Sequence, residues 1–206
     1  MKLTTLILVC AISLSLAIEQ PLYKVIQKLG NNMEIRIYVP TKWVTTQVDV
    51  RLRDVGFKIN DMYSKLYDYI SGANSDKQKM DMTAPFLMSY VSKNNRTINE
   101  DSEVTASMSF YIPSKFRNNT PKPSANNVVI RELPIFVTAV ARISFRWAYL
   151  PIFMQTRDDL VKALGSDAKS YDTINMVTAN YNSTLISNNY WTFLVTKLHE
   201  VWLPKM

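Results

Sequence analysis

Two neighbouring motifs in the first half of the chain decide its fold: Tyr69-Ile-Ser-Gly-Ala-Asn74 and Lys79-Met-Asp-Met-Thr-Ala-Pro85. Ahead of the first motif, apolar residues recur at helical spacing from Val55 to Ile70, which predicts an amphipathic helix. After the second motif, the apolar run at residues 86–91 predicts a strand. The chain therefore passes from a helix into a sheet through these two motifs.

Local signals mark the ends of two helices. Asp54 is the expected N-cap of the first helix and Gly72 its expected stop. A second helix is expected over residues 151–164, with Pro151 in its first turn and Gly165 at its end. Alternating or β-branched segments predict strands at residues 23–37, 43–50, 86–91, 104–112, 174–181 and 190–202, with further strands starting near 130 and 136.

The second half of the chain repeats patterns of the first. Ile130-Arg-Glu-Leu-Pro resembles Ile35-Arg-Ile-Tyr-Val-Pro, and Phe136-Val-Thr-Ala-Val resembles Trp43-Val-Thr-Thr-Gln-Val. Each half predicts two strands, a helix and two strands. This order indicates a duplication, with repeats at about residues 21–120 and 125–204, and chance similarity of two amphipathic modules is the alternative. We expect one α+β domain over residues 18–206, with a largely antiparallel sheet carrying two helices.

The first 17 residues have the pattern of a secretory signal peptide. Lys2 supplies the positive start, residues 3–16 the apolar stretch, and Ser15-Leu16-Ala17 a cleavage site. Cleavage would remove Cys10, the single cysteine, so a mature chain could form no disulfide. The apolar stretch is short for a membrane span, and no later run approaches 18 residues, so we expect a secreted, extracellular chain without stable membrane insertion.

Three sequons fit that route, at Asn95, Asn118 and Asn182, each in a polar stretch typical of a surface loop. An apolar fraction of 47% excludes a disordered chain. The formal net charge is +7, but the basic residues are scattered, so we expect no nucleic-acid partner. An acidic partner surface or an acidic ligand remains compatible with this charge.

Catalytic patterns are absent from the sequence. It has one histidine, no cysteine after the leader, and four glycines that do not cluster. These counts exclude a histidine-rich metal site, Cys–His catalysis and a glycine-rich phosphate loop. We therefore expect a binding protein and not an enzyme.

The two opening motifs, together with Phe110-Tyr-Ile-Pro-Ser-Lys-Phe116 and the ending Glu200-Val-Trp-Leu203, resemble the SOUL/heme-binding protein family. The resemblance holds in order from about residue 21 to residue 204. It implies a duplicated βαββ-type domain, a distorted antiparallel sheet or open barrel with two main helices. Bacterial drug-sensing regulator domains share that architecture.

The resemblance also implies non-catalytic binding of heme or porphyrin, or of another flat apolar molecule, along the first helix and a late loop at residues 185–191. Carried over by position, the ligand-binding residues are Tyr63, Leu66, Tyr67, Ile70 and Trp191. His199 is a candidate axial ligand, and Lys58 and Arg157 are candidate contacts for the heme propionates.

Each of these residues also has a purely structural interpretation. The two tyrosines can form a half-buried stripe, since they lie one helical turn apart. His199 can be a hydrogen-bonded histidine at a sheet edge, and Lys58 and Arg157 can be solvated surface charges. Met80 and Met82, at strand spacing, fit core packing or a soft wall of the ligand pocket.

An alternative function follows from where the chain departs from its relatives. Asn60 and Phe193 stand where basic residues are proposed to meet propionates, and the first half has no histidine. The alternative is a structural or protein-interaction module that keeps the fold and has lost heme binding. An exposed patch at Trp43 or Trp147 would favour that alternative.

Overall fold

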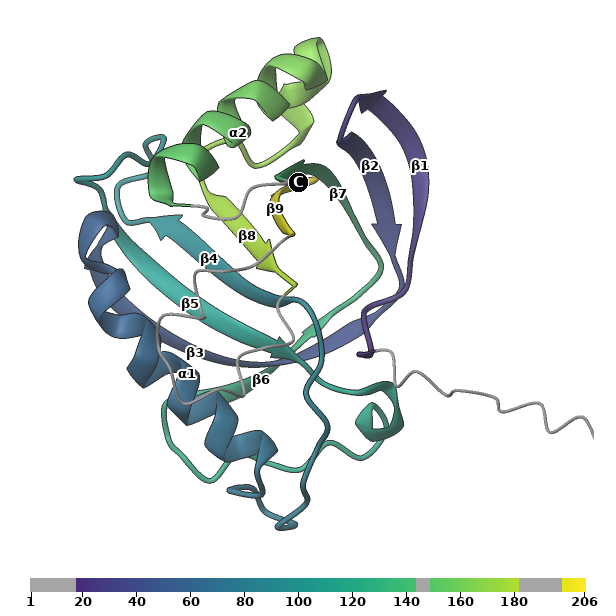
Figure 1. The fold of residues 1–206 in the computed structure, drawn as a ribbon, viewed down its shortest axis with the longest axis vertical. Helices are drawn as coiled ribbons and strands as arrows, with labels where there is room; N and C mark the ends of the chain where they lie inside the picture. Colours follow the sequence, from purple (N-terminus) through teal and green to yellow (C-terminus); the bar gives the residue numbers. More distant parts are fainter. Residues whose placement is uncertain (1–17, 144–148, 182–197) are drawn as a thin grey trace, which may run out of the picture.

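The computed structural model describes residues 18–143, 149–181 and 198–206 (Figure 1). The leader at residues 1–17, Asn182, Trp147, Trp191 and the start of the last predicted strand lie outside the described residues. The two helices are α1 (Gly56–Ile70) and α2 (Leu150–Leu164). The strands are β1 (Tyr23–Gly30), β2 (Met33–Tyr38), β3 (Thr41–Arg51), β4 (Phe86–Ser92), β5 (Glu103–Tyr111), β6 (Val128–Leu133), β7 (Phe136–Ile143), β8 (Met176–Asn180) and β9 (His199–Pro204).

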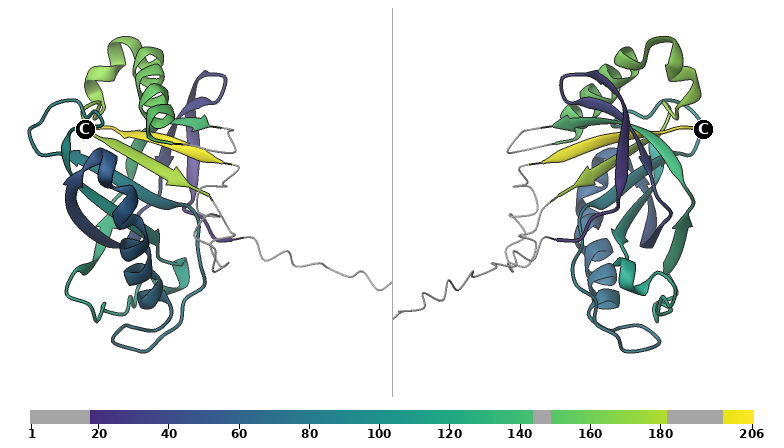
Figure 2. Two further views of the ribbon diagram at one scale, coloured as in Figure 1. Left: turned by 60° about the vertical axis from the view of Figure 1, so that its left-hand side comes forward. Right: turned by 90° about the vertical axis from the view of Figure 1, so that its right-hand side faces the viewer.

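All of these strands form one antiparallel sheet in the order β1-β2-β7-β9-β8-β4-β5-β3-β6. The sheet curls into a half-barrel, as Figure 1 shows. Helix α1 packs against β3 and β5, and helix α2 against β7 and β9, so the helices cover different parts of the outer face (Figure 2). The predicted α+β class, with a distorted antiparallel sheet and two helices, is confirmed.

The connection between β2 and β3 explains the curl. These strands lie near opposite ends of the sheet order, yet only Val39 and Pro40 join them. Two residues span less than about 11 Å even when fully extended, so the sheet must bend to bring its two ends together. The bend draws the aromatic side chains of Tyr38, Trp43, Tyr111 and Trp202 into one cluster on the inner face.

The strand alternation divides the core between the two faces. Along β4, Phe86 and Met88 pack outward with α1, whereas Leu87 packs inward with Trp202. The outer face holds most of the apolar core, which includes Met62 and Leu66 of α1, both essentially inaccessible to solvent. Burial of these side chains is the main force that holds α1 on the sheet.

Two local predictions were wrong. Residues 23–37 form two strands because the chain turns at Asn31 and Asn32, where Asn32 takes a positive φ of 63°. Asp54 lies in a short 3-10 helix, Leu52–Asp54, and the N-cap of α1 is Val55, which makes no side-chain capping bond. The hairpin is therefore encoded by Gly30-Asn31-Asn32, a turn signal that the alternation of the segment concealed.

The other helix ends agree with the sequence. Gly72, with φ 113°, follows the C-cap of α1. Pro151 lies in the first turn of α2, and Gly165, with φ 56°, is its C-cap. Both glycines adopt a conformation that residues with a Cβ avoid, so each ends its helix where predicted.

Candidate functional site

A cavity of about 320 Å³ lies beside the C-terminal half of α1. The helix contributes Tyr63, Tyr67 and Ile70, which share one face because their spacing follows the helical turns. The opposite wall is a returning segment, held by a hydrogen bond of 2.8 Å from the Met80 N–H to the Ile70 carbonyl oxygen. The complete lining is Tyr63, Tyr67, Ile70, Ser71, Lys79, Met80 and Met82.

The loop that leads into this wall is organised by Asn74. Its side-chain amide donates to the carbonyl oxygens of Tyr69 and Gln78, and its Oδ1 accepts from the backbone N–H groups of Asp76 and Gln78. Because Asn74 is 4% exposed, these bonds are shielded from water and hold the loop in place. The motif around residues 69–74 therefore positions the wall of the cavity.

Two tyrosine rings form the aromatic part of the cavity. Tyr63 and Tyr67 stack with ring centroids 6.0 Å apart and an interplanar angle of 16°, and Tyr63 meets Phe110 edge-on at 5.3 Å. Tyr67 is 44% exposed, so its ring is accessible at the cavity mouth. Burial, with a smaller contribution from Tyr67, raises the pKa of the Tyr63 phenol to about 12, so the phenol stays neutral at physiological pH.

The remaining predicted site residues lie elsewhere. Leu66 is fully buried in the core beneath α1 and does not line the cavity. Lys58 is exposed near the start of α1, away from the cavity lining. Arg157 is only 4% exposed, so the expectation of a solvated charge was wrong; its guanidinium donates to the Ile98 carbonyl oxygen at 3.1 Å and to Asp158.

Sequence reasoning did not assign Lys79 to the site. It is an exposed cation on the cavity wall, next to Met80, which is 8% exposed. Met80 packs in the outer core and Met82 packs against it, which confirms core packing, and both also line the cavity. The sequence offered one signal for Lys79, since it begins the motif at residues 79–85. Whether its side chain reaches the face of α1 that carries Tyr63 and Tyr67, however, depends on the path of the loop after α1.

His199 lines a different cavity. Strand β9 lies between β7 and β8, so His199 is not at a sheet edge as expected; it is 3% exposed. Its Nδ1 donates to Asn180 Oδ1 at 2.7 Å, since an amide oxygen can only accept, and Phe153 meets the imidazole edge-on. This cavity, of about 250 Å³, shares no lining residue with the cavity beside α1.

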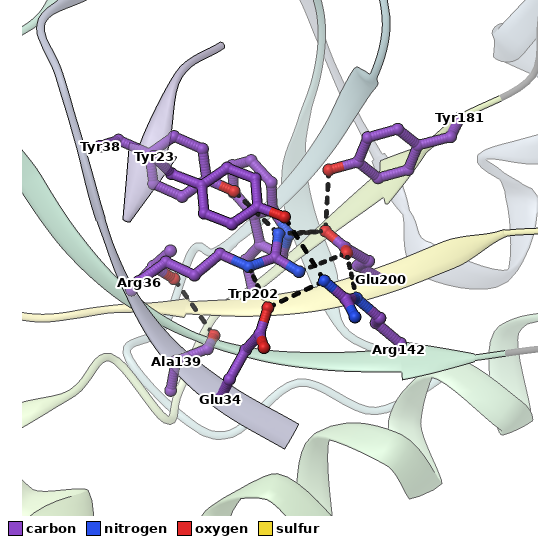
Figure 3. Close-up of polar contacts among 10 residues, drawn as sticks. Tyr23, Glu34, Arg36, Tyr38, Ala139, Arg142, Tyr181, Glu200 and Trp202 are labelled. Atoms are coloured by element: carbon purple, nitrogen blue, oxygen red, sulfur yellow. Dashed lines mark hydrogen bonds and ion pairs between the residues drawn. The ribbon is translucent and has the colours of Figure 1, made fainter. Parts of the chain in front are cut away.

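The inner face of the sheet carries a buried charge network (Figure 3). Arg36, fully buried, contacts both carboxylate oxygens of Glu200 at 3.0 and 2.7 Å and Glu34 at 2.7 Å. Arg142 also reaches both Glu34 and Glu200. Two cations thus face two anions, and this balance favours a role in joining β2, β7 and β9 over one in binding a charged ligand.

Aromatic side chains complete the network. The Tyr181 hydroxyl and the Trp202 indole N–H donate to Glu200, and Arg36 donates to the Tyr38 hydroxyl (Figure 3). Burial, with Glu200 beside it, raises the pKa of Tyr181 well above its usual range. Trp43 is 2% exposed and its indole donates to Thr41, so no exposed patch exists at Trp43.

The described residues contain no group of three or more His, Cys, Asp or Glu side chains arranged to hold a metal ion. Neither helix in the described ranges combines the length and apolar character needed to cross a membrane.

Solved structures share this fold at low identity. A conserved protein from Listeria innocua superposes with a TM-score of 0.59 at 8% identity, covering 88% of this chain and 94% of that one. The C-terminal domain of EcmrR gives a TM-score of 0.52 at 12% identity, covering 90% of this chain and 98% of that domain. At such identities these likenesses establish the architecture alone.

Closer relatives are found by sequence. Heme-binding protein 2 of Homo sapiens is 32% identical over 193 residues, covering 91% of this chain and 86% of the relative. Heme-binding protein 2 of Mus musculus is 30% identical over the same length. The sequence profile described as SOUL heme-binding protein matches residues 18–204, which is nearly all of the described chain. The chain therefore belongs to the SOUL heme-binding protein family.

Proposed function

We propose that this protein binds a tetrapyrrole, heme or free porphyrin, in the cavity beside α1, and that it does so without catalysis. Membership of the family supports tetrapyrrole binding in general. The observation that carries the placement is the stacked Tyr63–Tyr67 pair, with Tyr67 exposed, on a cavity of about 320 Å³ that Met80 and Met82 also line. The chemistry of this lining, aromatic and apolar with a cation at its rim, matches a flat ring that bears carboxylates.

Binding energy would come mainly from covering apolar surface, at about 25 cal/mol per Å². The cavity is smaller than a complete tetrapyrrole requires, so the macrocycle inserts along one edge and leaves the opposite edge in solvent. Met80 and Met82 suit an irregular contact of this kind because thioether side chains adapt to shape. Lys79 supplies a positive charge to one propionate at the rim.

The metal contributes little in this proposal. His199 lines the other cavity, and burial, which raises the pKa of the Tyr63 phenol to about 12, disfavours the phenolate form that would bind ferric iron. The protein therefore binds hemin and metal-free protoporphyrin IX with similar affinity.

Titration with each compound tests the proposal. We expect saturable binding of both, followed by tryptophan quenching and, for hemin, by the Soret band. Tyr67→Ala removes a ring face and is expected to weaken both by about tenfold. The matched control is Tyr149→Ala, an exposed tyrosine at the start of α2 that lies outside this cavity. Equal losses in the two variants would refute the placement, and no saturable binding would favour the interaction-module alternative.

A second pair of variants tests the propionate contact. Lys79→Met keeps the length of the side chain and removes its charge, and we expect a two- to fivefold loss of affinity that shrinks at high salt, as for an exposed ion pair of about 0.2–1 kcal/mol. The control is Lys58→Met. Lys58 is on α1 but does not line the cavity, so we expect this substitution to leave the affinity unchanged. A larger loss in Lys58→Met than in Lys79→Met would contradict this contact.

We also propose that the chain is secreted after removal of residues 1–17 and carries N-linked glycans. Asn95 is exposed in the loop between β4 and β5, and Asn118 is exposed after the 3-10 helix Ser114–Phe116. Expression in mammalian cells tests both points. The medium should contain a chain that starts at Ile18 and whose apparent mass on a gel decreases after glycosidase treatment. A chain that stays inside the cell and still begins at Met1 would refute both points.

A further inference from the structure

A second cavity, of about 250 Å³, lies on the outer face between the beginnings of α1 and α2. Residues of β4, β8 and β9 form its floor, and residues at or just before the first turns of both helices form its walls. The cavity is partly open to solvent, so a small molecule can enter it from the surface.

The chemistry of the lining is uneven. The walls are aliphatic and aromatic, with Ile59 on one side and Leu150 and Phe153 on the other. The floor is mixed: beside the apolar Phe86 and Met88 it contains Thr178 and the buried pair of His199 and Asn180, joined at 2.7 Å. A few polar groups among apolar and aromatic side chains are typical of a pocket that orients a ligand.

The lining of this cavity is rich in aromatic rings. Phe86 and Tyr90 belong to its floor, and Tyr149 and Phe153 to the side of α2. Tyr149 is 60% exposed, so its ring is accessible at the mouth of the cavity. Several rings lining one cavity are typical of a site for an aromatic molecule.

We propose that this cavity is a second ligand site, which binds a small aromatic molecule with one hydrogen-bonding group directed at the polar groups of the floor. Its volume exceeds the roughly 150 Å³ of a cavity that takes up benzene. The site is separate from the proposed tetrapyrrole site, since the two cavities occupy opposite ends of α1 and share no lining residue. The two ligands are therefore bound independently.

Methionine methyl groups report on the two sites separately. Met88 lines this cavity, whereas Met80 and Met82 line the cavity beside α1. With ¹³C-methyl-methionine protein, assigned through single Met→Ile substitutions, we expect p-cresol to shift the Met88 resonance saturably and to leave Met80 and Met82 in place. Toluene, which lacks the hydroxyl, is expected to bind at least threefold more weakly.

Gly56 offers a matched pair of variants. A Cβ built on this residue meets no atom within 4 Å, so a side chain there has room at the cavity wall. Gly56→Phe fills the cavity and is expected to reduce p-cresol affinity at least tenfold, whereas Gly56→Ala retains binding and serves as the folding control. Porphyrin binding should be unchanged in both, and Tyr67→Ala should leave p-cresol binding unchanged.

The outcomes separate the two sites. Saturable p-cresol binding that shifts Met88 and is lost in Gly56→Phe supports the second site whatever the result for porphyrin. Absence of saturable binding, shifts at Met80 or Met82 instead, or equal affinity in Gly56→Phe and Gly56→Ala overturns it. Equal affinity for p-cresol and toluene overturns the role of the polar groups of the floor.

Discussion

At the scale of single residues, Glu200 is a buried carboxylate that accepts hydrogen bonds from four of the described side chains. It accepts hydrogen bonds from the guanidinium groups of Arg36 and Arg142, from the Tyr181 hydroxyl and from the Trp202 indole (Figure 3). Its side chain is 2% exposed and that of Arg36 is 0% exposed. A charge removed from such a pair leaves the other uncompensated in a medium of low polarity.

We predict that Glu200→Gln lowers the free energy of unfolding by about 3–5 kcal/mol, because Arg36 stays buried with one of its two carboxylate partners neutralised. Urea denaturation measures the change. The control is Glu132→Gln, whose ion pair with Lys42 at 2.7 Å is exposed on the glutamate side, and which we expect to cost at most about 1 kcal/mol. Similar losses in both variants would show that the network contributes no more than a surface pair.

Buried tyrosines predict a loss of stability in alkali. Burial raises the pKa of Tyr63, Tyr69 and Tyr90 to about 12, against an ordinary value of 10.0. Between these values the unfolded chain has released protons that the folded chain retains, so the free energy of unfolding falls as pH rises above about 10 and is unaffected by these groups below it. Urea midpoints from pH 8 to 11.5 measure this, and Tyr90→Phe should flatten the decline. A slope unchanged by that substitution would contradict the assignment.

At the scale of elements, the helix ends show how local conformation limits which residues are tolerated. Gly56 and Gly165 both have open space where a Cβ would lie, so sterics do not distinguish them. Their backbones do: Gly165 has φ 56° and ψ −125°, whereas Gly56 lies in the first turn of α1 outside the left-handed region. The same substitution therefore has opposite consequences at the two positions.

We expect Gly56→Ala to raise the free energy of unfolding by about 0.5–1 kcal/mol, because alanine loses less backbone entropy in a helix. Gly165→Ala should lower it by about 1–3 kcal/mol, because alanine is strained at that φ and ψ. Thermal unfolding of the two variants beside the parent protein measures both. Changes of the same sign would refute the argument from backbone conformation.

At the scale of the whole molecule, the two halves of the chain are joined through the sheet. β2 pairs with β7, β3 with β6, and β4 with β8, and each of these pairs takes one strand from each half. Neither half forms its own complete sheet, since the strands of one half interleave with those of the other in the order of the sheet. We therefore expect that neither of the two proposed repeats folds independently.

The expected behaviour of residues 18–124 expressed alone follows from this pairing. In this half-chain, β2, β3 and β4 would each lack a partner strand on one edge. Open strand edges promote aggregation, and the apolar side chains that the missing strands cover would be exposed to water. We predict no cooperative thermal transition by circular dichroism, whereas residues 18–206 should unfold in one transition. A sigmoidal transition in the half-chain would contradict the prediction.

Taken by itself, the sequence determined the features that depend on near neighbours. The helix containing Tyr63 and Tyr67, the glycine stops at Gly72 and Gly165 and most strand positions, though not the turn that divides residues 23–37, follow from periodicity and turn chemistry within a few residues. The side-by-side placement of Tyr63, Tyr67 and Ile70 was predictable for the same reason, since helical geometry alone puts them on one face.

Only the tertiary structure decided which distant groups meet. It buried Arg157 against Ile98, placed His199 on a different cavity from the tyrosine pair, and brought Lys79 to the wall beside α1. These outcomes depend on strand order and on the path of returning loops, which join residues far apart in the chain. Local propensity carries no information on such pairings, because their free energy arises only once the sheet has closed around them.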